Sequence, residues 1–222
     1  MAFEQYDMAA QQQTQAVPVN KVVRNTFMLL SLTLAFSACT AVVSMMMGLE
    51  RMNIFVFFIG AFGLMFLVNK FQDSALGLVL AFAFTGFMGL SIGPVVSAYM
   101  SLPGGGQTVA NALGSTAVIF LALSGYALAS KKDFSFLSGF LFAGGIVLMG
   151  AVVVGLFTEI PGLQLAISAG FALFACAAIL YETSAIVNGG QQNYIAATVS
   201  LYLSLYNLFL SLLQLFGVLG DD

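Results

Sequence analysis

The chain has 222 residues, of which 60% are hydrophobic and 7% are charged, and its mean hydropathy is +1.02. Soluble domains carry about a quarter charged residues, so this composition excludes an ordinary soluble fold. The net charge of −3 comes without a basic patch, which gives no indication of nucleic-acid binding.

Residues 1–20 form a polar segment before the first long apolar run. The segment contains Gln11, Gln12, Gln13 and Gln15 and few bulky apolar residues, a composition typical of disorder. We therefore expect two parts, a disordered cytoplasmic tail over residues 1–20 and one membrane domain over residues 21–222.

Long uncharged stretches follow the tail. A helix crosses the roughly 30 Å apolar core of a bilayer in about 20 residues, and seven stretches pass or nearly pass this test. They lie at residues 26–48, 53–69, 75–100, 108–130, 134–158, 163–187 and 194–219. None shows the alternation of a barrel strand, and open strands cannot satisfy their backbone in lipid. We predict an all-α integral membrane protein with seven transmembrane helices.

The basic residues predict the orientation, because Lys and Arg are retained on the cytoplasmic side of short loops. One face has five of them: Lys21, Arg24, Lys70, Lys131 and Lys132. The other face has only Arg51, beside Glu50. We expect the N-terminus in the cytoplasm and the C-terminus on the opposite side.

Residues 89–93, Gly-Leu-Ser-Ile-Gly, match the G-x-S-x-G pattern of serine hydrolases. That motif needs a strand-turn-helix context and a base, whereas these residues lie inside a predicted helix and the chain has no histidine. The absence of histidine and the presence of only two cysteines also argue against most zinc, haem and iron sites. We expect no enzymatic activity, no metal site and no cofactor.

Glu182 is the one acidic residue well inside a predicted span. Charge at this depth is costly, so such a residue by default faces the bundle and has a function. Because an apolar surrounding disfavours the charged form of a carboxyl group, a buried Glu182 is a candidate sensor of cytoplasmic pH. Alternatively, its side chain extends to the inner interface and has no such role.

The last predicted helix carries a polar stripe, which consists of Ser200, Ser204, Asn207, Ser211 and Gln214. Steps of four, three, four and three residues place them on one face of a helix. A polar face is unfavourable against lipid, so we expect it to point into the bundle, toward Glu182. The stripe either lines a solvated pathway or supplies hydrogen bonds for helix packing.

Several segments in order match a known pattern. The most specific are residues 131–139 (Lys-Lys-Asp-Phe-Ser-Phe-Leu-Ser-Gly), 179–183 (Ile-Leu-Tyr-Glu-Thr) and 200–209 (Ser-Leu-Tyr-Leu-Ser-Leu-Tyr-Asn-Leu-Phe), with further matches at 21–35, 83–94 and 114–120. Through them the chain resembles the Bax inhibitor (transmembrane Bax-inhibitor-motif) family, and within it the bacterial YccA-like branch of FtsH protease modulators. The resemblance covers nearly everything after the tail.

The resemblance implies a seven-helix bundle whose last helix is central. In family members linked to a pH-sensitive calcium leak, two aspartates on the sixth and seventh helices share a proton, and an arginine near the second helix modulates them. Glu182 matches the first position, whereas Ser204 occupies the second, so the pair is broken here. Lys70 is the nearest basic residue to the arginine, and Asn207 completes the candidate pH-sensing or ion-pathway residues.

The YccA-like branch implies a different function, in which a membrane AAA protease of the FtsH type is the partner. Such a protein occupies the protease as a poor substrate in the bacterial inner membrane, with its C-terminus in the periplasm. The regulatory membrane partners of that protease are further candidates. The protease-engaging residues would be Met1, Ala2, Phe3, Glu4, Gln5, Tyr6 and Asp7.

Three hypotheses remain from the sequence: a protease modulator, a calcium or proton leak through Glu182, and a structural membrane protein. Removal of the tail should abolish the first function and spare the second, whereas Glu182→Gln should do the opposite. The third would be indifferent to both changes, because in that case the tail is an inert leader.

Overall fold

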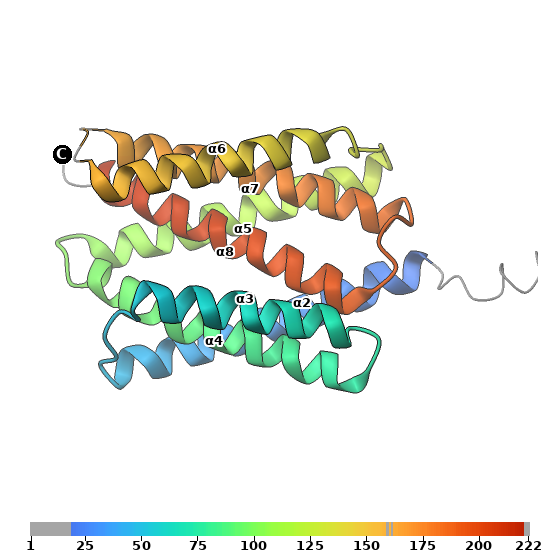
Figure 1. Ribbon diagram of the computed structural model, residues 1–222, viewed down its shortest axis with the longest axis horizontal. Coiled ribbons are helices and arrows are strands. Elements are labelled where there is room, and N and C mark those ends of the chain that lie inside the picture. The colour runs from blue at the N-terminus through green and yellow to red at the C-terminus, as the bar shows by residue number, and fades with distance from the viewer. Residues whose placement is uncertain (1–18, 159, 161, 220–222) are drawn as a thin grey trace, which may run out of the picture.

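The computed structural model describes residues 19–158, 160 and 162–219. This part of the chain forms seven helices and no strand, and the helices run side by side along one long axis (Figure 1). They are α2 (Val19–Met46), α3 (Ile54–Phe71), α4 (Ala75–Met100), α5 (Gly105–Ser130), α6 (Leu137–Phe157), α7 (Leu163–Val187) and α8 (Tyr194–Leu219). All seven are long and apolar enough to cross a membrane. The predicted all-α fold class is confirmed.

Three helices, α4, α7 and α8, begin and end at the predicted residues. The largest difference is at α2, which begins at Val19 and not at residue 26. Residues 19 and 20 of the expected tail are therefore helical, while residues 1–18 lie outside the described part. A helix satisfies its own backbone beyond the apolar layer, and the long side chains of Lys21 and Arg24 can reach water from there. The polar start of α2 consequently does not end the helix.

Helix α8 lies at the centre of the bundle. In the most apolar stretch of α8, 72% of the residues are buried inside the bundle. In the corresponding stretch of α6, none is buried. Helix α8 contacts α7, α5 and α2 most extensively and α4 and α3 less, while α6 packs against α7 alone. Leu201, Leu208 and Leu213 of α8 are fully buried. The predicted central position of the last helix is confirmed.

Helices α2 and α4 form the most extensive contact in the bundle. A Cβ atom on Gly89 of α4 would collide with the backbone oxygen of Ser37 and the hydroxyl of Thr40. On Gly93 it would lie 2.6 Å from Cβ of Ser44. The Ser44 hydroxyl donates a hydrogen bond of 2.8 Å to the backbone oxygen of Leu90. These glycines let the two backbones approach closely, which is how membrane helices associate without a hydrophobic drive.

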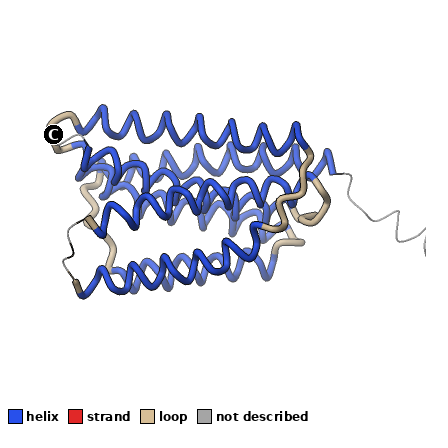
Figure 2. Tube along the Cα trace, turned by 90° about the horizontal axis from the view of Figure 1, so that it is seen from above, coloured by secondary structure: helices blue, strands red, loops and turns tan. Residues whose placement is uncertain are grey.

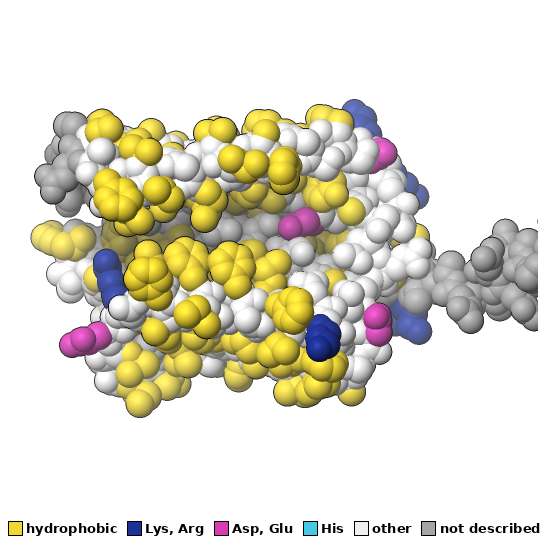
Figure 3. Space-filling model, in the orientation of Figure 1, with side chains coloured by type: hydrophobic (Ala, Val, Ile, Leu, Met, Phe, Trp, Pro, Cys, Tyr) yellow, Lys and Arg dark blue, Asp and Glu magenta, His cyan; other side chains and the backbone are white. Residues whose placement is uncertain are grey.

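Short loops join the helices at two ends of the bundle (Figure 2). The tail end, where the chain enters α2, also holds the connections at residues 72–74, 131–136 and 188–193. The far end holds the connections at residues 47–53 and 101–104, together with the described residues 158, 160 and 162 between α6 and α7. On the face shown in Figure 3, hydrophobic side chains cover the middle and basic side chains lie toward the ends. The five basic residues expected on one face all belong to the tail end, and Arg51 belongs to the far end. Which end faces the cytoplasm stays a prediction.

Candidate functional site

Glu182 of α7 and Ser204 of α8 are joined by a direct hydrogen bond. The Ser204 hydroxyl donates to Oε2 of Glu182 over 3.0 Å. Ser204 is buried and Glu182 is half-buried, and no ion pair to Glu182 occurs among the described residues. A hydroxyl next to the carboxyl group partly replaces the water that the group would have outside the bundle. Figure 3 shows an acidic side chain in a hollow between two groups of helices, away from both ends.

The polar stripe of α8 is turned into the bundle, because all five of its residues are buried or half-buried. Two of them contact α7: Ser204 reaches Glu182, and Oε1 of Gln214 accepts a 2.6 Å hydrogen bond from Ser168. The Ser211 hydroxyl bonds instead to the backbone oxygen of Asn207 within α8, over 2.7 Å. The expected direction of the stripe, toward Glu182, agrees with these contacts.

Asn207 and Lys70 do not join this pair. Asn207 is half-buried on α8, one turn beyond Ser204, and its side-chain amide makes no hydrogen bond within residues 19–158, 160 and 162–219. Lys70 is exposed in the last turn of α3, with Nζ 5.7 Å from the ring centroid of Phe71. Helices α3 and α7 do not contact each other. Residues Met1 to Asp7, the expected protease-engaging segment, lie outside the described part.

Ser184 of α7 and Asn188, which caps the end of that helix, hold the connection at residues 131–136. Sequence reasoning did not assign this role. The Ser184 hydroxyl donates to the backbone oxygen of Lys132 over 3.0 Å and accepts from the backbone nitrogen of Phe134 over 3.0 Å. Asn188 donates from Nδ2 to the same Lys132 oxygen over 3.2 Å. The only signal in the sequence was the match at residues 131–139, which gives no contact partner.

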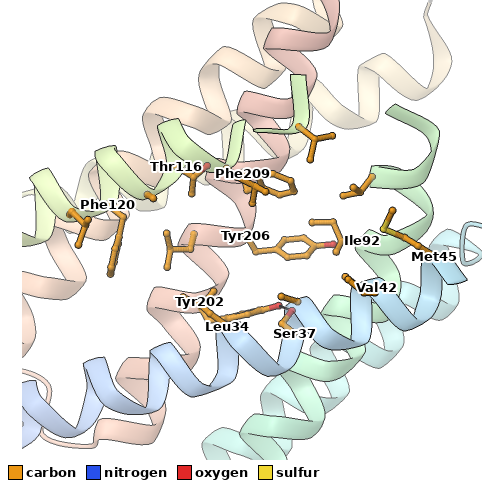
Figure 4. Close-up of a pocket in the computed structure, with 18 residues that line it drawn as sticks. Leu34, Ser37, Val42, Met45, Ile92, Thr116, Phe120, Tyr202, Tyr206 and Phe209 are labelled. Atoms are coloured by element: carbon orange, nitrogen blue, oxygen red, sulfur yellow. Dashed lines mark hydrogen bonds between the residues drawn. The ribbon is translucent and has the colours of Figure 1, made fainter. Parts of the chain in front are cut away.

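A separate cavity of about 470 Å³ lies between α2, α4, α5 and α8 (Figure 4). The backbones of α2 and α5 stay apart, although the rings of Phe27 and Phe120 approach to a centroid distance of 6.0 Å. Helix α8 lines the cavity between them. The Tyr206 side chain extends across the cavity toward Ile92 (Figure 4). Tyr202 is hydrogen-bonded to Ser37 of α2 over 2.6 Å. Among the described residues, the lining of this cavity is almost wholly apolar and has no charged side chain.

Comparison with known proteins agrees with this architecture. The family model described as "Inhibitor of apoptosis-promoting Bax1" matches residues 19–221. The chain belongs to the Bax inhibitor family. Within this family it is 57% identical over 204 residues, 92% of either chain, to an uncharacterized protein of Pseudomonas aeruginosa. It is 48% identical over 209 residues, 94% of this chain and 95% of the relative, to the Escherichia coli protein named Modulator of FtsH protease YccA. An uncharacterized membrane protein of Vibrio cholerae is 44% identical over 204 residues, 91% of this chain and 92% of the relative.

Membership of the Bax inhibitor family confirms the resemblance inferred from the sequence runs, including its YccA-like branch. The family match begins at the first residue of α2, and therefore covers every helix of the described bundle. The roles of Glu182, Ser204, Asn207 and Lys70 are not decided by these similarities and remain predictions.

Proposed function

We propose that this chain binds a membrane-embedded ATP-dependent protease of the FtsH type and restrains it as a slowly degraded competitor of other membrane substrates. The observation that carries the proposal is the 48% identity, over 94% of the chain, to the protein named Modulator of FtsH protease YccA. The chain is then a multi-pass regulator of the inner membrane that acts without catalysis or a cofactor. Regulatory membrane partners of the protease are further candidate partners.

The packing of α2 supports slow degradation. A protease that pulls on residues before Val19 must extract α2 first, and α2 is held by its close contact with α4. Hydrogen bonds add to this contact, from Ser44 to Leu90 and between Ser37 and Tyr202 of the central α8. When chain pulling competes with reclosure of the bundle, the local stability of the first element sets the rate of degradation. A firmly held α2 therefore prolongs occupancy of the protease.

The distribution of charge supports a cytoplasmic position for residues 1–18, the segment that we propose the protease grips and that we call the handle. Five of the six basic residues lie at the tail end, and Lys and Arg near membrane helices favour the cytoplasmic side. Residues 1–18 would then extend from this end into the cytoplasm, where a processive protease can grip an uncompacted segment. Because α2 begins at Val19, removal of residues 2–18 shortens the handle and leaves the helix intact.

The half-life of the full-length chain in cells tests the proposal. We expect slow degradation that depends on the protease, and at least a threefold longer half-life after removal of residues 2–18. A matched control replaces residues 2–18 with a glycine-serine segment of equal length, which keeps a flexible handle and should restore degradation. A half-life that is the same with and without the protease would contradict the proposal.

A leak of protons or calcium through the bundle is the second candidate, and the hydrogen bond between Glu182 and Ser204 is the observation that favours it. The amide of Asn207, which makes no hydrogen bond among the described residues, lies one turn further along the same face of α8. The described residues contain no cluster of three or more acidic, histidine or cysteine side chains that could hold a metal ion. Calcium would therefore pass without such a group of coordinating side chains. Flux into liposomes with the wild-type chain and with Glu182→Gln tests this candidate, which fails if the two fluxes are equal.

A further inference from the structure

A second polar cluster lies at the far end of the bundle, away from Glu182, in a cavity of about 290 Å³ between α4, α7 and α8. Its polar lining consists of Arg51, Tyr99, Gln164, Ser168 and Gln214. Arg51 comes from the connection between α2 and α3, so four separate parts of the chain contribute to this cavity. We name it the Arg51 pocket.

Hydrogen-bond donors outnumber acceptors in the Arg51 pocket. The guanidinium group has five N–H donors and no acceptor, and Arg51 makes no ion pair within the described part of the chain. The buried Ser168 hydroxyl lies 2.6 Å from Oε1 of Gln214 and 2.9 Å from the backbone oxygen of Gln164, and the shorter contact occupies Oε1. The amide N–H groups of Gln214 then have no acceptor among the described residues.

Among the residues that the structure describes, no acidic side chain lines the Arg51 pocket, so the single formal charge of this lining is positive. A guanidinium group matches the paired oxygens of a carboxylate or phosphate, and such charge-assisted bonds are stronger than neutral ones. We propose that the Arg51 pocket binds an anionic group with several acceptor oxygens, a carboxylate or a phosphate. The guanidinium group and the Gln214 amide donate to these oxygens, and the Tyr99 ring forms part of the wall.

The size and position of the pocket limit the source of the anion. Small-molecule sites occupy about 300–1,000 Å³, so 290 Å³ accommodates one headgroup or one small molecule and no folded segment. The pocket lies near the ends of three spanning helices, at the depth of lipid headgroups. The same chemistry is offered by a phospholipid phosphate and by a soluble anion. The inference is independent of the protease partner.

Binding is measured on the full-length chain with two kinds of probe. Inorganic phosphate and acetate are titrated against the detergent-solubilised protein at constant ionic strength, with thermal stability as the readout. Phosphatidylglycerol is offered in nanodiscs beside phosphatidylcholine, and retained lipid is counted by native mass spectrometry. The variants are Arg51→Gln and, as a matched control, Arg24→Gln, which removes another exposed arginine, at the tail end.

We expect Arg51→Gln to weaken binding of at least one anionic probe tenfold or more, and Arg24→Gln to leave that binding within twofold of wild type. A second variant keeps the charge: a Cβ on Gly217 would collide with the Tyr99 ring, so Gly217→Ala should also weaken binding. Its control is Gly63→Ala, whose Cβ meets no atom within 4 Å.

The two probes separate the two sources. Loss of phosphatidylglycerol alone in Arg51→Gln identifies a lipid headgroup, and loss of the phosphate or acetate response identifies a soluble anion; either result supports the pocket. Equal binding by wild type and Arg51→Gln, or an equal loss in Arg24→Gln, overturns it. Because Arg51 is exposed, its replacement should leave the fold intact, which circular dichroism checks.

Discussion

Ser204 on the central helix α8 donates a hydrogen bond of 3.0 Å to Oε2 of Glu182 on α7, and these are two of the most extensively packed helices in the bundle. The bond engages Oε2 of the one carboxyl group that the described helices carry within their spans. It therefore contributes to helix packing whether or not Glu182 also handles protons. Substitutions at the two positions separate these roles.

Ser204→Ala should lower the free energy of unfolding by about 0.6 kcal/mol, the average for a hydrogen bond between membrane helices. The matched control is Ser200→Ala on the same stripe, because the Ser200 hydroxyl makes no hydrogen bond among the described residues. Reversible unfolding in mixed detergent micelles measures both variants. An equal effect of the two substitutions would show that the bond to Glu182 contributes no stability.

Gly89→Ala should destabilise the contact between α2 and α4 by about 1–3 kcal/mol, because an added methyl group in a closely packed contact forces a backbone shift. The obstructing atoms belong to Ser37 and Thr40, and one of them is a backbone oxygen that cannot turn aside. Gly63→Ala in α3 is the control, since its Cβ lies in open space and alanine favours the helix. In detergent, the thermal unfolding temperature of Gly89→Ala should lie well below that of Gly63→Ala.

The sequence determines the spans because apolar length and short polar connections are local properties. It also gives the direction of the α8 stripe, since residues three and four apart share a helix face. The start of α2 at Val19 was missed because apolar length does not register a helix that extends past the membrane core. The end of a helix that extends beyond the apolar layer is located only from the backbone of the structure.

The Arg51 pocket could not be predicted, because its polar residues lie far apart in the chain. The stripe on α8 placed Gln214 inside the bundle but did not identify its partners. Ser168 and Gln214 are 46 positions apart, and only the packing of α7 on α8 brings them together. In the same way, Ser184 gave no sign that it holds the backbone at Lys132 and Phe134. The periodicity of polar and apolar residues shows which face of a helix is buried. It does not show which residues of another helix that face contacts.

The orientation predicted from the basic residues can be measured by thiol labelling in intact cells. Ser101→Cys at the far end and Ser135→Cys at the tail end are compared in a background with Cys39→Ala and Cys176→Ala. Both serines are exposed in connections, and neither change alters a basic residue. A membrane-impermeant reagent should label position 101 and leave position 135 unlabelled until the cells are broken. The reverse pattern would place the tail end outside.

If the chain restrains a membrane protease by occupying it, a second membrane substrate of that protease must be degraded more slowly when the chain is present. The substrate's half-life is followed in cells that produce the intact chain, the chain without residues 2–18, or Glu182→Gln. We expect the intact chain and Glu182→Gln to prolong the substrate's half-life severalfold, and the shortened chain to leave it unchanged. A half-life that is the same in all three cases and in cells without the chain would show that the chain does not restrain the protease.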